Sequence, residues 1–143
     1  MRRRTLLLAT LLIPAGLVAA SAKDQVFDLF AKIAEALSAD DPLVFLHAID
    51  HDMPHYDDFQ VNLTALASQA EITNSIEVLS DQGDDEHRAE ELDWYIQLVD
   101  KGDATVTRRR EVVHCRLERR AKKWKIVAIE PFSLFAPLKE TKR

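Results

Sequence analysis

The chain has 143 residues, of which 47% are hydrophobic and 30% charged, and its formal net charge at pH 7 is −5. This length suits one ordinary domain. Cys115 is the only cysteine, which excludes an intramolecular disulfide and a site built from clustered cysteines. Because Cys115 lies in the middle of a predicted strand, we expect a small, buried, apolar side chain.

Residues 1–22 have the pattern of a signal peptide. The start is basic, residues 5–19 are apolar, and residues 20–22 (Ala-Ser-Ala) have the small-x-small form that signal peptidase cleaves. We therefore expect an exported protein, periplasmic or secreted, whose mature chain begins at Lys23. The alternative is an uncleaved membrane anchor, because the apolar run approaches the roughly 18–20 residues that span a bilayer. Pro14 and the small residues at its end favour cleavage.

Three helices are predicted before residue 70. Residues 24–38 carry apolar side chains at helical spacing, which is typical of an amphipathic helix. A second helix over residues 41–52 has Asp41 as its cap and Pro42 at its first position. Met53 precedes a proline, so this helix is expected to end there. Residues 57–69 form the third, short helix.

Four antiparallel strands are predicted to follow, at residues 71–80, 86–99, 105–119 and 123–130. Gly83 and Gly102 lie in the first two turns, where hairpins need residues that tolerate a positive φ. Helices followed by a meander predict an α+β fold, with the N-terminal helices packed on one face of a curved antiparallel sheet. The domain is expected to cover residues 23–137, and residues 138–143 are expected to form a disordered tail.

Residues 108–110 are three consecutive arginines in the third predicted strand. Side chains alternate across a strand, so at least one guanidinium must face the helices, and Glu90 and Glu91 divide in the same way. An unpaired interior charge would cost several kcal/mol, so ion pairs are expected. Arg110 with Asp93 or Glu91, and Arg108 with Glu90, remain alternatives, because a turn longer by one residue reverses the partners.

The basic residues from 108 to 125 have the charge pattern of a nucleic-acid-binding stripe. The alternative is that they lie beside the acidic second strand, which carries Glu86, Glu90, Glu91 and Asp93 and can neutralise them. An acidic, exported chain favours the alternative, so we expect no nucleic-acid partner.

The second predicted helix and the turn after it hold many ionisable side chains. His47 and His51 are four residues apart and would share a helix face, as metal-binding histidines do, with His55 or Asp58 as a third ligand. The alternative is a polar helix end, where histidine suits the helix dipole. We favour the alternative and expect neither a metal nor another cofactor. Asp50 and His51 are candidates for acid/base catalysis.

The last predicted hairpin contains Leu117-Glu118-Arg119 and Trp124-Lys125-Ile126, and a phenylalanine-rich segment, residues 131–135, follows it. With the order of helices and hairpins, this pattern resembles the NTF2-like (SnoaL/ketosteroid-isomerase-like) superfamily, and in particular its exported bacterial members, over nearly all of residues 23–137. The resemblance implies a cone-shaped pocket and frequent dimerisation through the sheet. No acid/base set of its enzymatic branches matches this chain residue by residue.

Several residues of the second and third strands are candidates to line such a pocket. They are Glu90, Asp93, Trp94, Tyr95, Arg108, Arg110 and His114. An arginine with unused donors on the pocket floor would bind a carboxylate or phosphate of a small ligand. The alternative is a structural network of ion pairs, with the tryptophan as part of the core.

The sequence lacks the motifs of serine hydrolases, phosphate-binding loops and zinc proteases. We expect an exported, non-enzymatic NTF2-like module that binds a small anionic or apolar ligand or a partner protein, and that forms a homodimer through its sheet. One alternative is a pocket enzyme that performs acid/base chemistry on a small organic molecule. Another is a structural dimerisation domain with a collapsed cone.

Overall fold

The structure is a computed structural model that describes residues 21–140. Most of the predicted signal peptide, residues 1–20, and the end of the predicted tail, residues 141–143, lie outside the described residues. Between residues 21 and 140, no helix is long and apolar enough to cross a membrane.

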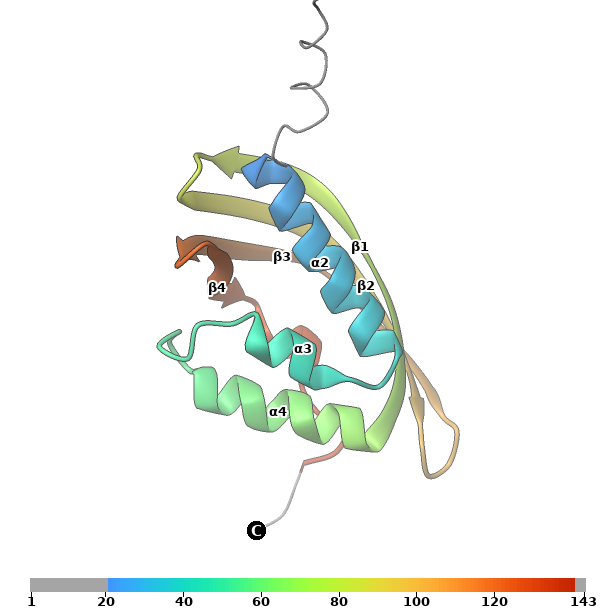
Figure 1. The fold of residues 1–143 in the computed structure, drawn as a ribbon. Helices are drawn as coiled ribbons and strands as arrows, with labels where there is room; N and C mark the ends of the chain where they lie inside the picture. Colours follow the sequence, from blue (N-terminus) through green and yellow to red (C-terminus); the bar gives the residue numbers. More distant parts are fainter. Residues whose placement is uncertain (1–20, 141–143) are drawn as a thin grey trace, which may run out of the picture.

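Four long strands form one antiparallel sheet in the order β1-β2-β3-β4. They are β1 (Ala70–Gly83), β2 (His87–Asp100), β3 (Val106–Arg120) and β4 (Lys123–Glu130). Figure 1 shows the strongly curved sheet with the helices on one of its faces. The predicted α+β class and four-strand meander are therefore confirmed.

Three helices precede the sheet: α2 (Ala22–Ser38), α3 (Pro42–His47) and α4 (Tyr56–Gln69). The second helix is shorter than predicted, because it ends at His47 rather than near residue 52. Beyond it the backbone pairs with β4: the Asp50 amide donates to the Ile126 carbonyl over 2.9 Å, and the Ile126 amide donates to the Ala48 carbonyl over 2.8 Å. These bonds replace those of a continued helix.

The turn between β2 and β3 differs from the prediction in one respect. The first turn agrees with the prediction, because Gly83 has a positive φ of 136°. In the turn between β2 and β3, the positive φ belongs to Ala104, at 62°, and Gly102 has none. The side chain of Asp100 organises this turn, because its Oδ1 accepts hydrogen bonds from the amides of Gly102 (2.7 Å) and Asp103 (3.2 Å).

The pairing register decides which side chains face the helices. In β2 every second residue is buried, from Glu90 through Trp94 to Asp100, and the residues between them lie on the opposite face. In β3 the buried residues are Val113, Cys115 and Leu117, which are paired opposite Leu92, Glu90 and Arg88. We call the face opposite the helices the open face of the sheet.

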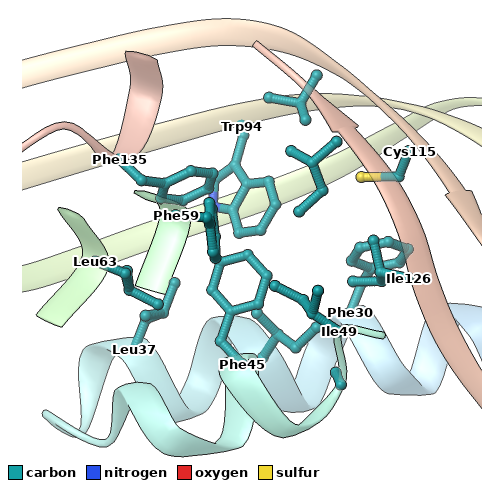
Figure 2. Close-up of a cluster of buried hydrophobic side chains, with 14 of the residues drawn as sticks. Phe30, Leu37, Phe45, Ile49, Phe59, Leu63, Trp94, Cys115, Ile126 and Phe135 are labelled. Atoms are coloured by element: carbon teal, nitrogen blue, oxygen red, sulfur yellow. The ribbon is translucent and has the colours of Figure 1, made fainter. Parts of the chain in front are cut away.

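Aromatic side chains fill the space between the sheet and the helices. Phe135, in the 3-10 helix η2 (Phe132–Phe135), lies 5.0 Å from Trp94 and 5.3 Å from Phe45 between ring centroids. Phe45 is in turn 5.3 Å from Phe59. Figure 2 shows these rings, together with Phe30, in one cluster of buried side chains. Rings at such distances are in direct contact and leave no space for a ligand between them.

Candidate functional site

The open face of the sheet collects most of the residues that the sequence singled out. Five of the pocket candidates alternate along β2 and β3 with the buried residues, so they lie together on this face. They are Asp93, Tyr95, Arg108, Arg110 and His114. They were expected inside a pocket between sheet and helices. The register instead places them where, within residues 21–140, no helix covers them (Figure 1).

Two pairs on this face join neighbouring strands. Arg110 Nε and Nη2 donate to the two carboxylate oxygens of Asp93 over 2.9 and 2.6 Å. The hydrogen bond from Arg110 holds the pKa of Asp93 below its ordinary value. His114 Nδ1 lies 3.7 Å from Glu91 Oε2. Of the alternatives that the sequence left open, the pair of Arg110 with Asp93 is the one that forms.

The remaining two pocket candidates face the helices. Trp94 is fully buried in the aromatic core, and its indole Nε1 donates to Asn74 Oδ1 over 3.0 Å. Glu90 is 3% exposed and lies on the same face of β2. Burial, followed by the neighbouring carboxyl group of Asp81, raises the pKa of Glu90 to about 8.

The inward arginine is Arg109, and neither Arg108 nor Arg110 faces the helices. Arg109 is paired opposite Ile96, a core residue, so its side chain shares the covered face. Its Nη1 donates to the carbonyls of Leu134 (3.0 Å) and Ala136 (2.6 Å), and burial lowers the pKa of its guanidinium. The expected carboxylate partner is thus replaced by backbone oxygens of the segment that follows β4.

Opposite charges occupy the two halves of the open face. Glu77 of β1 lies opposite Asp93 of β2, and Glu91 lies on the same face of β2 as Asp93, so this half is acidic. The other half carries the basic side chains of β3, namely Arg108, Arg110, His114 and Arg116, together with one acidic residue, Glu130 of β4. Val112, on the same face of β3, is 43% exposed. The open face therefore combines an exposed apolar side chain with two strips of opposite charge.

A shallow hollow of about 410 Å³ lies at one end of the open face. It is lined by residues of all four strands, among them Ser80, Gln82, Glu91, His114, Arg116 and Glu130. His114 is paired with Glu91 on one side and with Glu130 on the other. The hollow is thus a mixed polar surface in which His114 lies between strand residues that carry carboxyl groups and contacts that of Glu91.

The candidate acid/base residues hold the chain in place. The Asp50 carboxylate accepts from Arg120 Nη1 and, through Oδ1, from the Asp52 amide over 2.8 Å. The ring of His51 is exposed and lies 4.7 Å from that of Tyr56. Because the helix ends at His47, the histidine spacing no longer defines a shared face. The described residues contain no cluster of three His, Cys, Asp or Glu arranged to hold a metal ion.

Asp81 and Arg88 belong to the interior beside Glu90, although the sequence placed Asp81 in a turn. The cause is a bulge in β1 between Val78 and Ser80, which shifts the pairing by one residue and turns Asp81 toward the helices. The sequence does indicate the inward position of Arg109, because residues at every second position along a strand share a face and the apolar Cys115 and Leu117 are at such positions. The bulge left no comparable signal in the sequence.

No family model and no curated protein matches the sequence. Solved structures do share its architecture, an antiparallel sheet covered on one face by helices. An NTF2-like superfamily protein from Salmonella enterica aligns with a TM-score of 0.60 at 11% identity, over 84% of this chain and 94% of that chain. A conserved protein from Planctomyces limnophilus aligns with a TM-score of 0.59 at 9% identity, over 73% and 90% of the two chains.

A protein from Novosphingobium aromaticivorans, proposed to be an aromatic ring hydroxylase, aligns with a TM-score of 0.58 at 12% identity, over 78% of this chain and 89% of that chain. The chain therefore has the NTF2-like fold that its sequence resembles. At these identities the likeness is one of fold.

Proposed function

We propose that this chain is an exported, non-enzymatic interaction module that forms a homodimer through the open face of its sheet. The observation that carries the proposal is the division of that face into an acidic and a basic half. A two-fold axis that runs parallel to the strands, between the two halves, brings the same patch of both subunits together, so the acidic half of one subunit meets the basic half of the other. Val112 and Tyr95 supply apolar surface between the charges.

The filled interior supports a protein partner over a small ligand inside the cone. Phe45, Phe59, Trp94 and Phe135 are each at most 1% exposed and contact one another. A ligand between sheet and helices would have to displace these rings, which would cost several kcal/mol.

The alternative of an acid/base enzyme draws its support from the raised pKa of Glu90. However, both carboxyl oxygens of Glu90 are enclosed by the protein, so no substrate reaches them in this conformation. General acid/base catalysis requires hydrogen-bond contact with the reacting group. Dimerisation therefore accounts better for the distribution of polar groups.

The proposal of export rests on the signal-like start of the chain, and the fold favours one particular N-terminal residue after cleavage. Ser21 Oγ accepts a hydrogen bond from the Asp24 amide over 3.1 Å and caps α2, and Ala22 is 6% exposed within the core. Cleavage after Ala20, where residues 18–20 read Val-Ala-Ala, keeps both residues, whereas cleavage after Ala22 removes them. We therefore expect Ser21, rather than Lys23, to begin the exported chain.

Light scattering coupled to gel filtration tests the dimer. We expect the wild-type chain to elute as a dimer and Val112→Glu to elute as a monomer, because a charge replaces the apolar centre of the face. Val61→Glu is the matched control, since Val61 is 51% exposed on α4, away from the sheet face. A monomeric wild type, or equal dissociation of both variants, contradicts the proposal.

The intact mass of the protein recovered from the periplasm or medium of its host tests export separately. A chain that begins at Ser21 supports both export and the proposed processing point. A chain that begins at Lys23 supports export and contradicts the processing point. An unprocessed chain that is retained in the cytoplasm contradicts export itself.

A further inference from the structure

A polar cluster is enclosed at the hairpin end of the sheet, on the face that the helices cover. It consists of Asp81 of β1 with Arg88 and Glu90 of β2. Arg88 Nη2 donates to Asp81 Oδ2 over 2.6 Å, and the side chains of these two residues are each 10% exposed. Glu90 is 3% exposed, less than either of them.

Four buried atoms of this cluster have no hydrogen-bond partner: Asp81 Oδ1, Arg88 Nε, and both carboxyl oxygens of Glu90. If both acids are ionised, three of these atoms are acceptors and one is a donor. A single donor cannot satisfy three enclosed carboxylate oxygens. A buried charged group without a hydrogen-bond partner destabilises the folded state.

One additional proton removes most of this imbalance. A protonated Glu90 carboxyl can donate from one oxygen to the neighbouring Asp81 Oδ1, which gives a partner to the orphaned oxygen of Asp81 and to one oxygen of Glu90. The other oxygen of Glu90 then belongs to a neutral carboxyl group, whose burial costs less than that of a carboxylate. We propose that Asp81 and Glu90 form a buried site that binds one proton between their carboxyl groups, with Arg88 balancing the single remaining negative charge.

The surrounding charges agree with this assignment. Lys23 of α2 and Arg88 act on both acids and favour their ionised forms, while Cys115 of β3 contributes an apolar, fully buried neighbour. With Glu90 neutral, the enclosed pair of Asp81 and Arg88 carries no net charge. Burial, and then the Asp81 carboxyl, raise the pKa of Glu90 to about 8. Burial also acts to raise the pKa of Asp81, but the interactions with Glu90 and Arg88 outweigh it, and this pKa is lowered.

The proton site makes the hairpin end sensitive to alkaline pH. The unfolded chain loses the Glu90 proton near pH 4.5, whereas the folded chain keeps it to about pH 8. Between these values the folded state binds one more proton than the unfolded state, so stability is greatest below the lower value and falls as pH rises. For one proton, the equilibrium constant of unfolding increases about tenfold per pH unit in this window. The site is independent of the proposed dimer, because it lies on the opposite face of the sheet.

Infrared spectroscopy of the folded protein in heavy water at pH 6.5 tests the site directly. We expect a carbonyl stretching band of a protonated carboxyl group in the wild type, absent in Glu90→Gln and present in the control Glu91→Gln on the open face. Absence of the band in the wild type, or its persistence in Glu90→Gln, overturns the proposal.

Urea titrations from pH 5 to pH 8.5 provide the second measurement. The unfolding constant of Glu90→Gln should rise far less steeply with pH than that of the wild type or of Glu91→Gln, because the amide replaces the protonated acid and cannot ionise. If Glu90→Gln does not fold, Asp81→Asn takes its place. As the pH rises, the infrared band of this variant should disappear at a pH at least about one unit lower than in the wild type, because the amide removes the carboxylate that accepts the hydrogen bond from Glu90. Equal slopes, or an unchanged band, contradict a shared proton.

Discussion

Arg110 and Asp93 form a two-bonded ion pair across β2 and β3 on the open face, with distances of 2.9 and 2.6 Å. The side chain of Arg110 is 70% exposed and that of Asp93 is 16% exposed. The hydrogen bond lowers the pKa of Asp93 and raises that of Arg110. Because the Arg110 side chain is largely open to water, this ion pair contributes little to the stability of the fold, and it mainly holds the two charged side chains in place on the open face.

Arg110→Met should therefore change the free energy of unfolding very little. Methionine keeps part of the apolar stem, and the Asp93 carboxylate retains access to water. Urea titration at low protein concentration, where the proposed dimer would be dissociated, measures this effect. A loss of stability as large as that expected for Arg109→Met would indicate a desolvated pair inside the covered face.

Arg109→Met should destabilise the fold more, by about 1–3 kcal/mol, because the carbonyls of Leu134 and Ala136 lose their charged donor. Arg108→Met is the matched control on the exposed side of the same strand, and a change below about 0.5 kcal/mol is expected there. The comparison uses chemical denaturation of both variants. Equal effects would contradict the inward placement of Arg109.

Phe135→Ala should lower the free energy of unfolding by about 3–5 kcal/mol, because it opens a cavity between Trp94, Phe45 and Phe59. If the variant folds, added benzene should raise its melting temperature by filling this apolar space. Leu43→Ala is the control, since Leu43 is 58% exposed. A Phe135→Ala variant as stable as this control would mean that the core is not packed around η2.

Ser21→Ala should cost about 1 kcal/mol, because the Asp24 amide loses its capping oxygen. A chain that begins at Lys23 should be less stable still, since it also lacks the buried Ala22. Thermal unfolding of both, with Ser133→Ala as an exposed control, measures the contribution of the cap. If the shortened chain is as stable as the longer one, Ser21 and Ala22 do not belong to the folded domain.

Local patterns in the sequence determined the elements of this fold and their order. The apolar spacing of α2, the Asp41-Pro42 start of α3 and the alternation along β2 each depend on near neighbours, so they could be read without a structure. The same alternation also marks Glu90 as an interior residue, because Leu92, Trp94 and Ile96 lie on the same face of β2.

Tertiary contacts decided the rest. The bulge after Val78 turns Asp81 inward, and the bridge between Ile49 and Ile126 ends the second helix early. Both depend on strands that meet only after the chain has folded, and a shift of one residue moves a side chain to the other face of the sheet. Composition and periodicity therefore predict which segments form helices and strands, whereas only the pairing register places charges inside or outside. That placement separates the buried acid pair from the open, charge-divided face.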